Sequence, residues 1–205
     1  MAPPARRASP VRWGEPPPGL LSRTGARLRR WVGGPPPPSS PALPELPVAL
    51  RRSELAAPYL SAAAAADHPA AGEAATTAME RSAAAGEWWP ADIWGHRALW
   101  HFERAGMELE ATRAARMIGD LRTDAGDPLS ARRYYAEAIS EARDLGSERE
   151  QGLAALGMGR AAMDLSDVTT ARRLGQVAEE LLERAAAPPG EIAAARELRG
   201  EEKEV

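Results

Sequence analysis

Small and acidic residues recur along this chain at a spacing of 40 positions. A small residue followed by an acid occurs at Gly86, Gly126 and Ser166. Alanines follow all three at the same two distances, at positions 91, 131 and 171 and at positions 98, 138 and 178. Repeats of this length are typical of stacked structural units that bury their apolar faces against each other. The pattern therefore predicts an all-α fold built from three copies of a two-helix unit.

The apolar periodicity between these markers predicts six helices in three pairs. We expect the pairs at residues 70–85 with 90–105, 108–125 with 128–145, and 148–165 with 168–186. A preceding helix is expected at 50–66, kinked or broken at Pro58 because proline interrupts helical hydrogen bonding. Residues 191–199 continue the 40-residue register, and we expect this half-repeat to cover the open C-terminal end of the stack.

Residues at the expected helix ends support these boundaries. Asp127 before Pro128, and Ser147 with Glu150 three positions later, are typical N-terminal caps. Glycines stand at positions 86, 106, 126 and 146, where a left-handed residue commonly ends a helix. We therefore expect short turns and antiparallel neighbours throughout.

The first 47 residues differ from the rest in composition. They hold 13 of the 19 prolines, and proline both fixes the backbone and lacks an N–H donor. We expect residues 1–47 to be a disordered or polyproline II arm, residues 48–200 to be the helical domain, and residues 201–205 to be a short acidic tail. The arm has no continuous apolar core, so we do not expect a secretory signal.

The net charge of −3 is unevenly distributed. Residues 1–52 carry nine arginines and two glutamates, for a net charge of +7, and residues 53–205 carry 17 basic and 27 acidic residues, for −10. The chain has no cysteine, so a disulfide framework or thiolate metal site is excluded. No apolar run approaches the roughly 20 residues of a membrane span, and we expect a cytoplasmic protein.

The second unit resembles the tetratricopeptide repeat family. The matching residues are Gly119, Gly126, Asp127, Ala131, Tyr135 and Ala138. The family's usual period is about 34 residues, and the longer period here is similar to that of repeat arrays in bacterial regulatory proteins. The resemblance implies a right-handed α-solenoid whose first helices line a concave groove for a peptide or a partner's helix. It implies no catalysis and no cofactor.

Two positions depart from the family pattern. Gly95 in the first unit and Gly175 in the third stand where the second unit has Tyr135. These departures leave open how the second helices of those units pack.

The resemblance also implies the residues that face the groove. Carried over by register, they are Arg113, Arg116, Asp120, Asp124, Leu156, Arg160 and Asp164. Geometry alone places Arg113, Arg116 and Asp120 on one helical face, and Arg160 is expected beside Asp120 in the neighbouring unit. Arginines in such an arrangement suit a carboxylate or phosphate on a partner. The alternative is a solvated face in which salt bridges join the helices.

An aromatic cluster in the first unit is a second candidate surface. Trp94 aligns with Tyr134 and is expected in the core, whereas Trp100 aligns with Ser140 and is expected to point outward. An exposed Trp100 could contact a partner. Alternatively, the helix at 50–66 covers it, or the proline-rich arm folds back onto the rings.

Catalytic and metal-binding arrangements are not expected. His96 and His101 are five positions apart and point about 140° away from each other on a helix, so they cannot share one ion. No nucleophile, base or carboxylate pair can be assembled with any specificity. We predict a non-enzymatic protein-interaction module, with a role as a sensor or adaptor in bacterial regulation. The alternative is a nucleic-acid or anionic-surface binder that acts through the basic arm.

Overall fold

The computed structural model describes residue 43 and residues 45–200. The predictions for residues 1–42 and for the tail at 201–205, including disorder and nucleic-acid binding by the arm, lie outside these residues. Leu46 belonged to the predicted arm, but it is buried and accepts a hydrogen bond from Arg51 Nε (2.6 Å). The folded domain therefore begins slightly before position 48.

The described part of the chain is all-helical, as predicted, and contains no strand. Its helices are α2 (Val48–Arg51), α3 (Ala56–Ala64), α4 (His68–Ala84), α5 (Trp88–Ala105), α6 (Glu108–Asp124), α7 (Pro128–Asp144), α8 (Glu148–Asp164), α9 (Val168–Arg184) and α10 (Pro189–Arg199). The six paired helices and the terminal helix lie within a few residues of their predicted positions. The expected helix at 50–66 is two helices, and it breaks at residues 52–55 rather than at Pro58. Pro58 fits inside the first turn of α3, where no backbone N–H has a helical partner.

Helix ends follow local chemistry. Asp67, Asp127 and Asp167 cap α4, α7 and α9 by accepting a hydrogen bond from the backbone N–H three residues later. Ser147 stands at the N-cap position of α8, as predicted, but its side chain makes no cap hydrogen bond. Glu150, its expected partner in that cap, contacts α6 instead.

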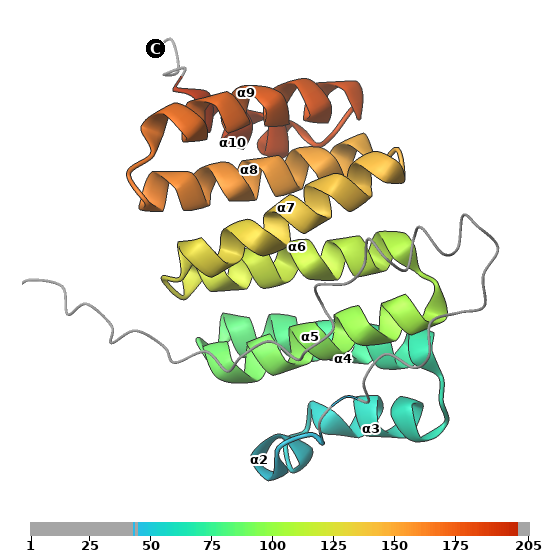
Figure 1. Cartoon of the computed structure of the whole chain (residues 1–205). Coiled ribbons are helices and arrows are strands. Elements are labelled where there is room, and N and C mark those ends of the chain that lie inside the picture. Colours follow the sequence, from blue (N-terminus) through green and yellow to red (C-terminus); the bar gives the residue numbers. More distant parts are fainter. Residues whose placement is uncertain (1–42, 44, 201–205) are drawn as a thin grey trace, which may run out of the picture.

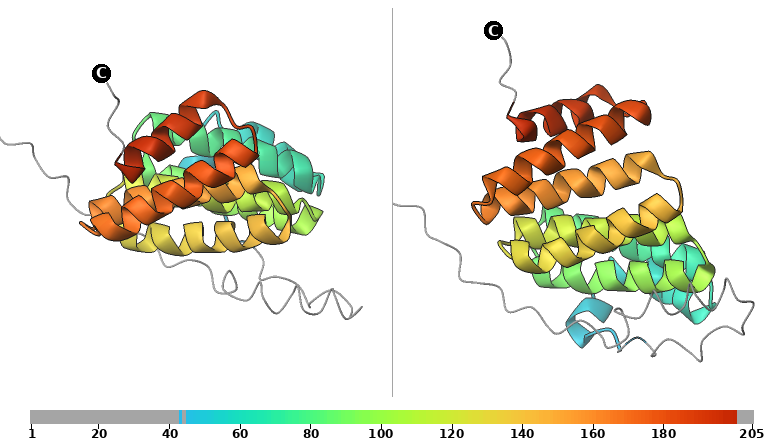
Figure 2. Two further views of the ribbon diagram at one scale, coloured as in Figure 1. Left: turned by 90° about the horizontal axis from the view of Figure 1, so that it is seen from above. Right: turned by 45° about the horizontal axis from the view of Figure 1, so that its top comes forward.

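Consecutive helices pack side by side in an antiparallel array (Figure 1). The α4–α5, α6–α7 and α8–α9 turns lie along one edge of the stack, and the α3–α4, α5–α6 and α7–α8 connections lie along the opposite edge. The views of Figure 2 show successive pairs offset from each other. Contacts beyond immediate neighbours join α6 to α8 and α10 to α8. The right-handedness implied by the family resemblance stays a prediction.

Alanine builds much of the core. The repeat alanines at 91, 98, 131, 138, 171 and 178 are all fully buried, and Trp94 is buried among them as predicted. Small side chains let the helix backbones approach closely, so a few large residues suffice to fill the remaining space. The largest fully buried apolar side chains are Trp94, Tyr135, Leu99, Ile118 and Leu182.

Glycines provide room for these large side chains. A Cβ at Gly119 would lie 2.8 Å from the ring of Tyr135, and a Cβ at Gly157 would clash with the same ring. Tyr135 of α7 is thus wedged between α6 and α8. Tyr135 is fully buried, as are Ala131 and Ala138 on the same helix.

Candidate functional site

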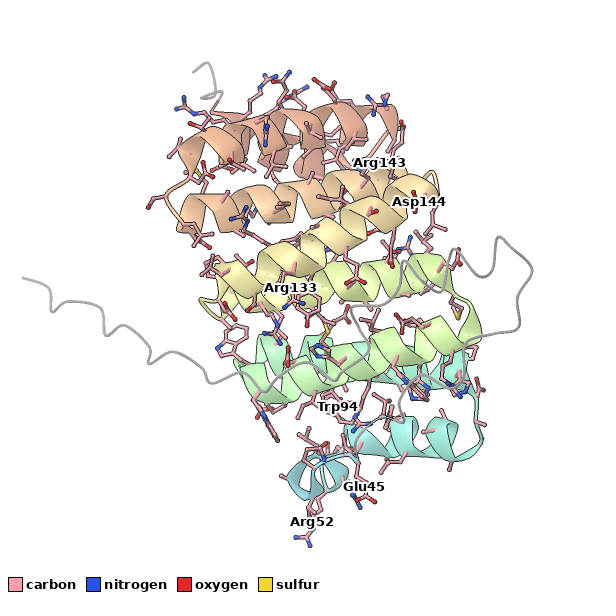
Figure 3. The ribbon with its side chains drawn as sticks, viewed as in Figure 1. Glu45, Arg52, Trp94, Arg133, Arg143 and Asp144 are labelled. Carbon is pink, nitrogen blue, oxygen red and sulfur yellow. The ribbon has the colours of Figure 1, made fainter. Side chains whose placement is uncertain are left out.

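All seven predicted groove residues lie on two neighbouring first helices, α6 and α8. We call the face formed by Arg113, Arg116, Asp120, Asp124, Arg160 and Asp164 the α6–α8 surface. Figure 3 shows charged side chains of many elements standing out from the stack. Because α6 and α8 contact each other directly, side chains on one helix can reach the other.

A buried carboxylate that the sequence did not reveal joins the two helices. Glu150 of α8 accepts hydrogen bonds from Arg113 Nε (3.0 Å) and Arg116 Nε (3.2 Å), and its side chain is only 4% exposed. Arg116 also donates to Asp120 Oδ2 (2.6 Å). A buried carboxylate needs such partners, since an unpaired one is costly to bury. Arg116 therefore acts mainly as a link between helices, which is the alternative stated for this face.

Tyr135 extends this network from the second helix. Its hydroxyl donates to Asp120 Oδ1 (2.9 Å) and lies 3.2 Å from Thr123 Oγ1. Burial raises the pKa of Asp120 above its ordinary value, and the charge of Arg116 and the hydrogen bond from Tyr135 partly oppose this shift. Arg116 and Tyr135 thus hold the carboxyl of Asp120 in one position between them.

The remaining charges of the α6–α8 surface face solvent. Arg160, Asp124 and Asp164 are exposed. Burial raises the pKa of Asp124, the negative charges of Asp120 and Asp164 raise it further, and Arg160 opposes the shift. Arg160 also lowers the pKa of Asp120, which agrees with its expected place beside that residue. These groups are close enough to sense each other's charge, and they remain accessible.

One predicted groove residue does not belong to this surface. Leu156 is 4% exposed and packs in the apolar cluster that includes Ala155, Ala178 and Leu182. It offers no area to a partner. Arg113, by contrast, keeps 44% of its side chain exposed while its Nε is bound to Glu150.

Trp100 lies in a second cluster, at the N-terminal end of the stack. Its ring contacts those of His68 and His101, and the guanidinium of Arg104 lies over it. Trp100 is half-buried, and its indole nitrogen is buried without a hydrogen-bond acceptor. It is therefore not a free contact residue. His68, which begins α4, provides part of its cover. Cover by the predicted helix at 50–66 stays a prediction.

The histidines in this cluster form one hydrogen-bonded chain. Arg97 donates to the Tyr59 hydroxyl (3.0 Å), which lies 3.3 Å from His101 Nε2. His101 Nδ1 lies 2.9 Å from His68 Nδ1, and one of these two nitrogens donates to the other. Burial, reinforced by the charges of His68, Arg97 and Arg104, lowers the pKa of His101 to about 4. His101 is therefore neutral at pH 7.

His96 belongs to a separate network. Its Nδ1 donates to the backbone oxygen of Asp92 (2.7 Å), and its Nε2 accepts from the Tyr134 hydroxyl (2.8 Å). Arg122 donates to Asp92 Oδ1 (2.8 Å) and lies over the Tyr134 ring. The two histidines point into different networks, as their spacing predicted. Within residues 43 and 45–200, no three His, Asp or Glu side chains come together to hold a metal ion.

None of the described helices is both long enough and apolar enough to cross a bilayer. No protein-family model matches this chain, and no curated protein matches it either. The arguments for function therefore come from the geometry and charges of the residues described above.

Proposed function

We propose that this chain is a tetratricopeptide-like interaction module that binds a peptide or helix of a partner protein along the α6–α8 surface. The observation that carries the proposal is the layering of this surface. Arg116, Glu150 and Asp120 are fixed beneath it by hydrogen bonds, whereas Arg113 and Arg160 stay accessible above. Charged groups that are already held in place lose little side-chain entropy on binding.

The expected ligand is an acidic segment or a C-terminal carboxylate. Arg113 uses only Nε for Glu150, so its terminal nitrogens can face a carboxylate on a partner. Arg160 supplies a second guanidinium on the neighbouring helix. Asp124 and Asp164 flank it and would repel carboxylates placed elsewhere, which favours one binding register. An adaptor role in bacterial cytoplasmic regulation, similar to that of other long-repeat arrays, is part of this proposal.

The test is a comparison of three full-length baits. Arg160→Glu reverses an exposed charge on the surface, and Arg113→Gln leaves Glu150 bound to Arg116. Arg143→Glu is the matched control, because Arg143 is also exposed but lies at the end of α7. We expect wild type and the control to retain the same partner after chemical cross-linking in cells of the source organism, and the double surface variant to lose it.

The recovered partner should then bind wild type with an affinity that falls as salt rises, because the contacts are ionic. Affinity should fall less steeply with salt for the double surface variant, which carries both Arg113→Gln and Arg160→Glu. Equal affinity of the double variant and wild type for that partner would refute the α6–α8 surface as the binding site. Circular dichroism of each variant checks that the helices are intact.

A further inference from the structure

Exposed large apolar side chains gather at one edge of the stack. This edge consists of the turns between first and second helices, at residues 82–90, 122–130 and 162–170, and we call it the turn edge. Seven large apolar side chains are exposed in the described part of the chain, and four of them lie here: Trp89 (44%), Leu129 (65%), Met163 (45%) and Val168 (43%). The connections of the opposite edge, at 64–68, 104–108 and 144–148, contain none of the seven.

The turn edge is also acidic. Its three segments contain five acids and one basic residue, Arg122, which is buried, is bound to Asp92 and lies 3.7 Å from Asp127 Oδ2. The acids are Glu87, Asp124, Asp127, Asp164 and Asp167. Hydrogen bonds from Thr170 lower the pKa of Asp167, so this cap is charged at neutral pH, and Arg132 and Arg173 contribute from just beyond the edge. Each turn thus presents at least one carboxylate beside exposed apolar area.

One segment of this chain has the complementary chemistry. Residues 1–42 contain seven arginines, eleven prolines and two tryptophans, Trp13 and Trp31, against a single acid, Glu15. We propose that this segment docks on the turn edge of the same molecule. Its arginines pair with the carboxylates of the three turns, and its proline and tryptophan side chains pack on Trp89 and Leu129. Flat aromatic side chains are the usual partners of proline-rich segments, and arginine pairs well with carboxylates.

The geometry of the chain permits this contact. The described chain enters the fold at α2, which lies on the same side of the stack as the α4–α5 turn (Figure 1). Trp89 belongs to this turn, because α5 begins at Trp88. An extended proline-rich segment of this length spans up to about 130 Å at ~3.1 Å per residue. The three turns are separated by two helix spacings each, so the edge is roughly 40 Å long at 8–10 Å per helix. The segment can therefore reach every turn.

Absence of cysteine makes a direct distance measurement simple. Spin labels would be placed at Ser22→Cys in the segment and at one of two exposed arginines of α7, Arg133 or Arg143. The two arginines make a matched pair of sites, since both are exposed and both changes remove one positive charge. Figure 3 labels both: Arg133 lies towards the turn edge, and Arg143 is ten residues, about 15 Å, further along the helix.

Docking predicts a short, narrow distance distribution from Ser22→Cys to Arg133→Cys and a longer one to Arg143→Cys. It also predicts that 1 M NaCl, or Trp89→Gln with Leu129→Gln, broadens the short distribution and shifts it to larger values. Val177→Gln changes an exposed apolar residue in the middle of α9, away from the edge, and should have no effect. Thermal unfolding of each variant confirms that the fold is retained.

Two results would overturn the proposal. Equally broad distributions at the two α7 sites, insensitive to salt and to the edge variant, would mean that the segment does not dock there. A short distance that vanishes when labelled protein is diluted with unlabelled protein would mean that the contact joins two molecules rather than forming within one.

Discussion

The first and second helix pairs pack equivalent positions with large and small side chains exchanged. In the second pair a tyrosine on α7 fits between two glycines of the first helices. Forty positions earlier, a glycine on α5 faces bulky side chains. Gly119 of α6, Tyr135 of α7 and Gly157 of α8 form the crossing at the tyrosine. Forty positions earlier stand Met79 of α4, Gly95 of α5 and Met117 of α6. A Cβ at Gly95 would lie 2.7 Å from Met79 Sδ and 2.8 Å from Ile118 Cγ1, so these side chains already occupy the space.

The third pair uses a different solution again. Both Gly159 and Gly175 lack side chains, and α10 fills the gap. Leu198 lies over Gly159, and a Cβ at Gly175 would lie 2.7 Å from the backbone nitrogen of Arg199 and 3.0 Å from the oxygen of Ala195. At both Gly95 and Gly175, neighbouring elements therefore occupy the space that a tyrosine ring would need.

This difference explains where the candidate site lies. Only in the second pair does the second helix send a hydroxyl to the first-helix face, because Tyr135 reaches Asp120 and Thr123. Gly95 and Gly175 cannot make such a contact. The position of the Asp120 carboxylate on the α6–α8 surface thus depends on the tyrosine that only the second pair has at this place.

The largest effect should come from removing the element that compensates for the third pair. Truncation after Ala187 deletes α10 and uncovers the crossing at Gly159 and Gly175. We expect the free energy of unfolding to fall by about 2–4 kcal/mol, because Ile192 and Leu198 are partly buried and full burial of such a side chain contributes roughly 1.5–3 kcal/mol. Chemical denaturation measures this loss. An unchanged midpoint would mean that α10 does not cover the stack.

The first and second pairs should also respond to acid in opposite ways. In the unfolded chain His101 titrates near 6.5, and in the folded protein its pKa is about 4. Between these values the unfolded state binds the extra proton, so stability is complete above pH 6.5 and falls as the pH drops towards 4, by up to roughly 3 kcal/mol. Asp120 has a raised folded pKa, so its protonation favours the folded state as the pH falls.

The comparison that isolates His101 is the unfolding midpoint of wild type and His101→Gln from pH 7.5 to 4. The variant should lose less stability over this range, because glutamine does not titrate. Parallel curves for the two proteins would show that His101 binds protons equally in the folded and unfolded states.

Sequence periodicity predicted most of this fold for a physical reason. Each pair contacts mainly its neighbours, so the same packing recurs every 40 residues. The repeat therefore predicts the helix positions and the buried alanines. It could not predict compensation between elements, as at Gly175 and α10. It also missed Glu150, whose position beside Ser147 suggested a helix cap, because its contacts with Arg113 and Arg116 lie 37 and 34 residues away. Leu156 was misplaced because the register fixes a helical face only to within about one residue.

Alanine substitution distinguishes a glycine that faces the backbone of a neighbouring helix, Gly175, from one that faces side chains, Gly95. Gly175→Ala places a Cβ against the backbone of α10, which cannot move without displacing the helix, and should cost about 1–3 kcal/mol. Gly95→Ala meets only side chains, Met79 Sδ at 2.7 Å and Ile118 Cγ1 at 2.8 Å, and should cost less because side chains can shift without displacing a helix. The gain in helix propensity, up to about 1 kcal/mol, is the same at both positions. Equal losses in denaturant unfolding would contradict the distinction between the two crossings.

A similar effect is expected from the tyrosine hydroxyl alone. Tyr135→Phe keeps the ring between Gly119 and Gly157 and removes the hydrogen bond to Asp120. We expect a loss of about 1.5–3 kcal/mol, typical of a hydrogen bond to a charged group. NMR titration of Asp120 should also show a further rise in its pKa, because the hydroxyl helps to hold the carboxylate ionised. An unchanged pKa would remove Tyr135 from the network.

The most direct test transfers the second crossing into the first. Gly95→Tyr alone should destabilise the protein strongly, because Met79 and Ile118 fill the space it needs. Adding Met79→Gly and Met117→Gly recreates the glycine positions that flank Tyr135. If the two glycines make room for the new tyrosine ring, the triple variant is more stable to urea than Gly95→Tyr, although it contains two additional helix glycines. A triple variant no more stable than Gly95→Tyr would contradict the equivalence of the two crossings.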